Sequence, residues 1–134
     1  MKKSLLLLLV FIFSSFAQQK EYNIYLSNSG NDNLDGSLPV INKEKNKGPF
    51  KTLNRLKEEI IKTCNNENNI SFNIIFKGGI YNIEKTFKID SNLTKNKNVK
   101  IVFKNYKNDT VRFSGGIIVS NFTKIDDQSI LKRL

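Results

Sequence analysis

The sequence GPFKTLNRLKEEIIKTC, residues 48–64, contains the clearest structural pattern in the chain. Its apolar residues recur every three or four positions and would lie on one stripe of an α-helix: Leu53, Leu56, Ile60 and Cys64. Charged residues would face away from that stripe: Lys57, Glu58 and Lys62. Thr52 is suited to the N-cap position, and the pair Asn65-Asn66 would end the helix. We therefore predict one amphipathic helix over residues 52–63.

A strand and a loop rich in turn-forming residues precede this helix. Residues 22–26 alternate enough to form a half-buried strand. In the loop that follows, Gly30 and Gly36 can adopt positive φ, and Asp32 and Asp35 can accept hydrogen bonds from the backbone two residues further on. The loop continues into a polar insertion without periodicity over residues 38–47.

Short strands dominate the chain after the helix. They are rich in β-branched and aromatic residues and are separated by turns of Asn, Lys, Gly and Asp. We predict six of them: Phe72–Phe76, Ile80–Ile83, Thr86–Ile89, Val99–Phe103, Val111–Phe113 and Ile117–Val119. Short strands behind one helix are compatible with a sandwich, a small barrel or a β-solenoid, and periodicity alone does not choose among them.

The N-terminus has the features of a secretory signal peptide. A basic start precedes an apolar run over residues 5–13, and Ser15 and Ala17 are small residues at the −3 and −1 positions of a cut after Ala17. The run is too short to be a lasting membrane anchor, which needs about 20 residues. We predict a signal peptide over residues 1–17 and one domain over residues 18–134, in a secreted or extracytoplasmic protein (periplasm or cell surface) that does not span a membrane.

Cysteine content and charge restrict the function classes. The single cysteine, Cys64, cannot form an internal disulfide, so we predict that it is a buried apolar residue. The formal net charge is +10, from 22 Lys and Arg against 12 Asp and Glu. Nucleic-acid sites favour arginine, whereas almost all cations here are lysines scattered among asparagines. We therefore predict no nucleic-acid partner, and attraction to an acidic polysaccharide is favoured.

Five motifs follow one another in a particular order. They are Ile24-Tyr25-Leu26-Ser27 with Ser29-Gly30-Asn31-Asp32 and Asp35-Gly36, then Gly48-Pro49-Phe50-Lys51-Thr52-Leu53, Phe76-Lys77-Gly78-Gly79-Ile80-Tyr81, Phe113-Ser114-Gly115-Gly116-Ile117, and the tail Ile130-Leu131-Lys132-Arg133-Leu134. This order resembles the N-terminal region of bacterial pectate-lyase-like right-handed parallel β-helix proteins. The resemblance extends over nearly all of residues 22–134.

The resemblance implies a mostly β fold, made of an N-terminal cap helix and the first two or three coils of a right-handed parallel β-helix. Members of the family that this chain resembles are several times longer and carry their active groups on middle coils. We therefore expect an incomplete β-helix in an apparently truncated chain.

The residue pattern is consistent with a solenoid on physical grounds. The first coil of a solenoid needs a cover for its apolar face and its strand edge, and the amphipathic helix is suited to both. Gly78-Gly79 would let the chain turn a corner between faces of the coil. Apolar residues would then stack in successive coils: Ile74, Phe76, Ile101 and Phe103.

Candidate chemistry is sparse. The absence of histidine excludes a His-based triad and a His-ligated metal site on this chain. Asp32 and Asp35 form an acidic loop cluster without the bidentate glutamate that ends a calcium loop, which favours a turn-stabilising role. Asp126 and Asp127 are adjacent and would point to opposite faces of a strand. Arg112 is expected to be a solvated strand residue. We assign no catalytic, cofactor-binding or metal-binding residue.

Three hypotheses for function follow. The first is the N-terminal part of a secreted polysaccharide-acting β-helix protein, a lyase or glycoside hydrolase, that is not active alone. The second is a non-enzymatic surface β-helix, an adhesin or glycan-binding module. The third is a small, independent secreted β-domain. In the first two the partner is a polysaccharide.

Overall fold

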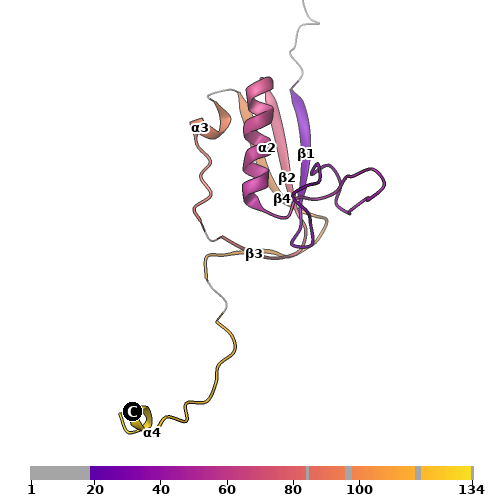
Figure 1. Cartoon of the computed structure of the whole chain (residues 1–134). Helices are drawn as coiled ribbons and strands as arrows, with labels where there is room; N and C mark the ends of the chain where they lie inside the picture. The colour runs from indigo at the N-terminus through magenta and orange to yellow at the C-terminus, as the bar shows by residue number, and fades with distance from the viewer. Residues whose placement is uncertain (1–18, 84, 96–97, 117–118, 134) are drawn as a thin grey trace, which may run out of the picture.

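A computed structural model describes residues 19–83, 85–95, 98–116 and 119–133 of the chain (Figure 1). The predicted signal peptide over residues 1–17 lies outside these ranges. The elements, in chain order, are β1 (Lys20–Leu26), α2 (Leu53–Asn66), β2 (Ile70–Phe76), β3 (Gly79–Asn82), α3 (Ser91–Thr94), β4 (Val99–Asn105), β5 (Val111–Ser114) and α4 (Gln128–Leu131).

The strands form two parallel sheets. The first has the order β1-β2-β4 and the second pairs β3 with β5. The chain therefore passes from one sheet to the other between β2 and β3 and again between β4 and β5, and Figure 1 shows β3 crossing below the first sheet. The prediction of a strand-rich, parallel fold with few helices is confirmed at this level.

The core lies between α2 and one face of the first sheet (Figure 1). Every second residue of β2 is fully or almost fully buried: Ile70, Phe72, Ile74 and Phe76. From α2, Leu56, Ile60 and Cys64 pack into the same cluster and are completely buried. Burying a large apolar side chain contributes about 1.5–3 kcal/mol, so this stripe is what holds the helix on the sheet.

The start of α2 is fixed by the residue that the sequence pattern indicated. Thr52 is the N-cap, and its Oγ1 accepts a hydrogen bond from Arg55 N at 3.2 Å. The helix ends at Asn66, slightly later than predicted. Leu53 is only half-buried, because it lies at the first turn, where the sheet no longer covers it fully.

The outer edge of β1 is covered by the loop over residues 27–50, not by the helix as we expected. Tyr25 N donates to Gly36 O at 2.8 Å, and Phe50 N donates to Tyr25 O at 2.9 Å. Figure 1 shows the loop on the side of β1 away from β2. A helix has no unpaired backbone edge to offer a strand, whereas an extended loop segment does, which explains the difference.

Two glycines of this loop are required for different reasons. Gly36 has φ +73°, as predicted. Gly30 does not need positive φ, contrary to expectation: a Cβ there would lie 2.4 Å from Phe50 O. Gly30 therefore permits a close backbone approach that seats Phe50 in the core.

Other strand predictions are partly right. β1, β2, β4 and β5 contain the predicted strands and are longer by one or two residues, and β3 is displaced by one residue. Residues 86–89 form no strand, and the short helix α3 was missed. Ile117–Val119 falls largely outside the described residues, and Val119 itself is in no strand.

The apolar residues predicted to stack lie on the paired strands β2 and β4. Phe72 pairs with Ile101, and Ile74 pairs with Phe103, whereas Phe76 pairs with Asn105. Phe76 still stacks on Phe103, with ring centroids 5.9 Å apart. The predicted corner is present, because Gly79 with φ +144° begins the strand of the second sheet.

Candidate functional site

A groove of about 330 Å³ lies where the N-terminal end of α2 faces the chain after β3. Its lining comes from segments far apart in the sequence: Asn28, Lys51, Thr52, Leu53, Asn54, Lys57, Tyr81, Asn82, Ile83, Lys85, Thr86 and Phe87. The groove is therefore a product of the fold rather than of one local motif.

Its polar lining is cationic and rich in amides. Lys51, Lys57 and Lys85 form no ion pair with any carboxylate that the structure describes. Among the described residues, no aspartate or glutamate lines the groove. Asn28 is held in place, because its Nδ2 donates to Ile80 O at 3.0 Å.

Tyr81 is anchored at the junction of the groove and the core. Its hydroxyl lies 2.8 Å from Lys77 O and 3.1 Å from Leu26 O, and it donates to one of these carbonyls at a time. Burial, with a contribution from the negative charge of Asp109, raises the pKa of Tyr81 to about 12. The phenol is therefore neutral near pH 7 and is not poised as a general acid or base there.

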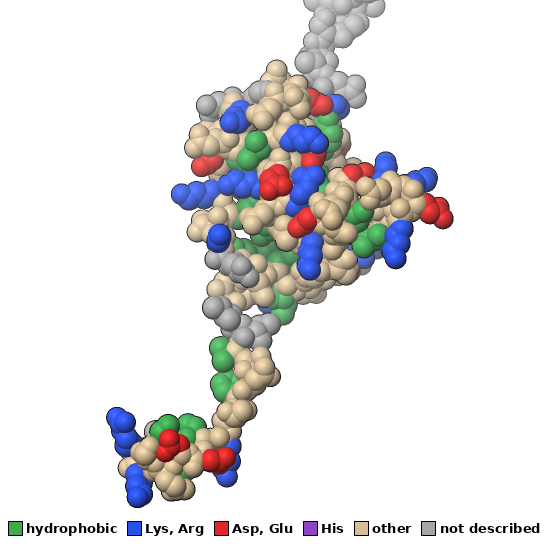
Figure 2. Space-filling view, viewed as in Figure 1, with side chains coloured by type: hydrophobic (Ala, Val, Ile, Leu, Met, Phe, Trp, Pro, Cys, Tyr) green, Lys and Arg blue, Asp and Glu red, His purple; other side chains and the backbone are tan. Residues whose placement is uncertain are grey.

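An apolar cleft of about 440 Å³ adjoins the groove. It is lined by Leu53, Phe76, Ile83, Thr86, Phe87, Phe103 and Phe113, of which Leu53, Ile83, Thr86 and Phe87 also line the groove. Phe103 and Phe113 remain 43% and 46% exposed. Figure 2 shows apolar surface on the lower part of the body, below α2. An open apolar surface of this kind is typical of a contact site.

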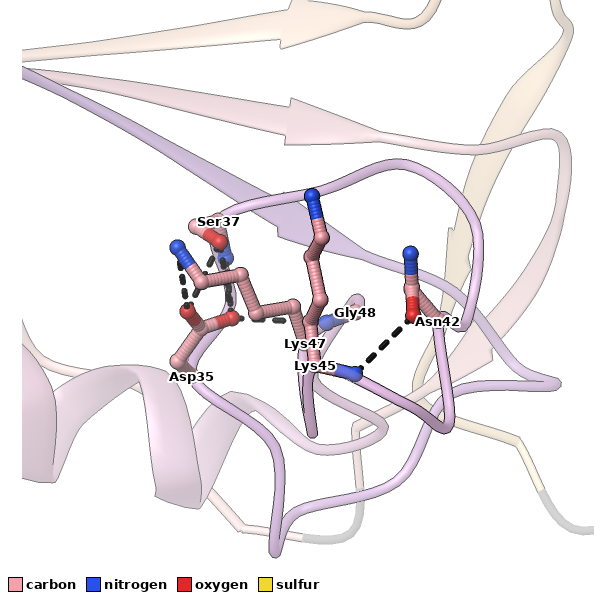
Figure 3. Close-up of polar contacts among 6 residues, drawn as sticks. All are labelled: Asp35, Ser37, Asn42, Lys45, Lys47 and Gly48. Carbon is pink, nitrogen blue, oxygen red and sulfur yellow. Dashed lines mark hydrogen bonds and ion pairs between the residues drawn. The ribbon is translucent and has the colours of Figure 1, made fainter.

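The carboxylates of the acidic loop cluster are engaged by groups of the chain itself. Asp35 lies beside Ser37, Lys47 and Gly48 (Figure 3). Its Oδ1 accepts from Ser37 N at 3.0 Å and Gly48 N at 3.3 Å, and Lys47 Nζ is 3.9 Å from Oδ2. Partial burial acts to raise the pKa of Asp35, but these hydrogen bonds outweigh it, so that pKa lies below its usual value. The predicted turn-stabilising bond is confirmed for Asp35.

Asp32 has a structural role that differs from the predicted one. Its Oδ1 accepts from Lys51 N at 2.7 Å and Thr52 N at 2.9 Å, and its Oδ2 accepts from Thr52 Oγ1 at 2.8 Å. These partners lie far along the chain rather than two residues on. The carboxylate therefore ties the loop to the start of α2, where negative charge is favourable.

The remaining candidates are not brought together at the groove. Arg112 is exposed on β5. Asp127 is the N-cap of α4, accepting from Ser129 N at 2.8 Å, and the hydrogen bonds from Ser129 hold the pKa of Asp127 below its usual value. Asp126 is exposed. Figure 1 shows residues 119–133 extending away from the sheets.

The described residues lack both a cluster of metal ligands and a membrane-spanning helix. They contain no group of three or more His, Cys, Asp or Glu side chains placed to hold a metal ion. They also contain no helix with the length and apolar character needed to cross a bilayer. Cys64 is buried in the core, as predicted.

Sequence reasoning missed the groove and its three lysines. We interpreted the lysines as scattered, solvated charges. Lys51 and Lys57 lie on either side of the start of the predicted helix. This closeness in sequence was the one available indication that two of the groove lysines lie near each other. Lys85 had none, because its approach to α2 depends on the path of the chain after β3.

No family model and no curated protein sequence matches the chain. A solved structure described as "Glycoside hydrolase" superposes on it with a TM-score of 0.62 at 21% sequence identity. The match covers 78% of this chain and 17% of that chain. The chain thus corresponds to a small part of that protein, and at this identity the likeness concerns the fold.

Proposed function

We propose that this chain forms the N-terminal cap and first coils of a right-handed parallel β-helix in a secreted, polysaccharide-acting protein. The observation that carries the proposal is the alternation of the chain between two parallel sheets. Ile70 pairs with Val99 and Gly79 with Val111, so that one turn takes about 30 residues. That length falls within the repeat range of roughly 20–50 residues of solenoid proteins.

The link to carbohydrate rests on the structural neighbour and on the sequence resemblance. The neighbour is described as a glycoside hydrolase, and the chain matches 17% of it. The pectate-lyase-like motifs of the sequence point to the same broad class of secreted proteins. We propose that export uses residues 1–17 as a signal peptide, which N-terminal sequencing of the exported protein would test.

The chain alone is proposed to be inactive as a lyase or glycoside hydrolase. Glycoside hydrolysis requires two carboxyl groups about 5–9.5 Å apart across the scissile bond. No described carboxylate lines the groove, and Asp32 and Asp35 are committed to backbone donors. Catalytic groups would therefore come from further coils, added at the exposed edges of β4 and β5.

One observation favours a second candidate, a non-enzymatic glycan-binding β-helix. The groove offers lysines, amides and aromatic surface, which are binding groups rather than a reactive pair. In this alternative the chain binds a polysaccharide but turns none over, even when further coils are present.

The test uses the exported, processed chain and a panel of soluble polysaccharides, both neutral and acidic. Affinity electrophoresis measures binding, and release of reducing or unsaturated sugar measures turnover. We expect retardation by at least one polysaccharide without turnover. Failure of every polysaccharide to retard the chain would contradict the proposed function, and turnover by this chain would contradict its proposed inactivity. A reading frame beyond codon 134 that continues the coils would separate the enzyme, with paired carboxylates on one strand face, from the binding module.

A further inference from the structure

We infer that the groove at the N-terminal end of α2 is a binding site for an anionic oligosaccharide, carboxylated or sulfated. The inference deepens the proposed function and rests on it in taking the ligand to be a glycan. Lys51, Lys57 and Lys85 all line the groove, and they come from the loop, the helix and the chain after β3. Three like charges around one hollow repel one another and attract anions.

The described carboxylates Asp32 and Glu59 do not line the groove. Asp32 is bound to the amides of Lys51 and Thr52, and Glu59 is paired with Arg55 at 2.8 Å. Because Asp32 already accepts hydrogen bonds from these two amides, an anion in the groove would be attracted by the lysine side chains rather than by the helix terminus. The ammonium groups of the three lysines remain available to a ligand.

The other lining groups suit a sugar rather than a bare inorganic anion. The amides of Asn28, Asn54 and Asn82 can donate to and accept from hydroxyl groups. Phe87 and Leu53 supply apolar surface against which the C–H face of a sugar ring can pack. A volume of about 330 Å³ is at the lower end of the range for ligand pockets, so a short segment of the glycan would occupy the groove.

Lysine leaves the nature of the anionic group open. Its ammonium is a compact point charge, whereas arginine would impose the planar, bidentate geometry that a carboxylate matches. The shared chemistry is therefore a negatively charged sugar. The experiment distinguishes the two sources with a sulfated heparin fragment and a short uronic-acid oligomer, and uses a neutral glucose oligomer of similar length as reference.

The decisive comparison is between two triple variants with the same change in net charge. One replaces Lys51, Lys57 and Lys85 with glutamine. The control replaces three exposed lysines away from the groove, Lys43, Lys45 and Lys100, with glutamine. Within the described part of the chain, none of the six side chains forms an ion pair or a side-chain hydrogen bond, so both variants should fold, which circular dichroism and a thermal melt would verify.

Isothermal titration calorimetry at low salt gives the dissociation constants. We expect at least one anionic oligomer to bind more tightly than the neutral one. The groove variant should bind it about tenfold more weakly, about 1.4 kcal/mol, while the control stays within about twofold. Equal losses in the two variants would show attraction to overall charge and would overturn the inference. If the neutral oligomer binds most tightly, the inference of an anionic ligand is overturned but the proposed function stands. If no glycan binds, both the inference and the proposed function are contradicted.

Discussion

Replacing Asp32 with alanine removes the side chain that ties the loop to the start of α2. Its carboxylate accepts three hydrogen bonds, from Lys51 N, Thr52 N and Thr52 Oγ1, at 2.7–2.9 Å. A hydrogen bond to a charged group contributes about 1.5–3 kcal/mol when buried, but Asp32 is partly exposed and water would replace part of each bond. We expect a total loss of about 2 kcal/mol, which lowers Tm by roughly 10 °C in a domain of this size.

Thermal melts followed by circular dichroism measure this effect, with Asp126→Ala as the control. Asp126 carries the same charge, and its exposed side chain forms no ion pair or hydrogen bond with the described residues, so its replacement should leave Tm almost unchanged. Calcium should not raise the Tm of the unmodified chain, because the Asp32 oxygens are already committed to the backbone. Equal melting of the two variants would refute the structural role of Asp32, and a calcium-dependent Tm that is lost in Asp32→Ala would indicate that Asp32 binds calcium instead.

Four further predictions concern stability and ionisation. Gly30→Ala should lose about 1–3 kcal/mol in urea unfolding, because its Cβ would meet backbone atoms at 2.4–2.7 Å, whereas Gly115→Ala, with open space around it, should be neutral. Ile60→Ala should lose about 2–5 kcal/mol in the same assay, because that side chain is completely buried. The pKa of Asp35 is lowered by folding, so its ionised carboxylate stabilises the folded state above the usual pKa, and this stability is lost as pH falls through the folded-state pKa. The Tm of Asp35→Asn should therefore lie below that of the parent chain near about pH 6, and the two Tm values should converge near about pH 3. The pKa of Tyr81 is raised by folding to about 12, so the neutral phenol stabilises the folded state fully below about pH 10, and this stability is lost as pH rises through about 12. An absorbance titration should show phenolate forming near pH 12, and Tyr81→Phe should lack this step.

The amphipathic helix was predictable because its determinants are local. The spacing of Leu56, Ile60 and Cys64 sets one apolar stripe, and Thr52 supplies the cap. No long-range information is needed to see that such a stripe requires burial. The same holds for the strand β2, whose alternate residues are all apolar and all buried.

The predicted strand over residues 86–89 failed for the opposite reason. Phe87 does pack against the core, yet the segment has no strand pairing among the described residues. A strand exists only where a neighbouring backbone supplies hydrogen bonds, and residue type does not report that neighbour. In the same way, the loop that covers β1 could not be foreseen from its turn-forming residues.

The sequence by itself determined what each segment can bury and where the chain can turn: the stripe of α2, the apolar face of β2 and the corner at Gly79. Only the tertiary structure decided which segments meet. It assigned Asp32 to the amides of Lys51 and Thr52, just before α2, and it gathered Lys51, Lys57 and Lys85 around one groove. The physical reason is distance along the chain, because burial preference is a property of a residue and its near neighbours, whereas convergence of charges depends on the path of the whole backbone.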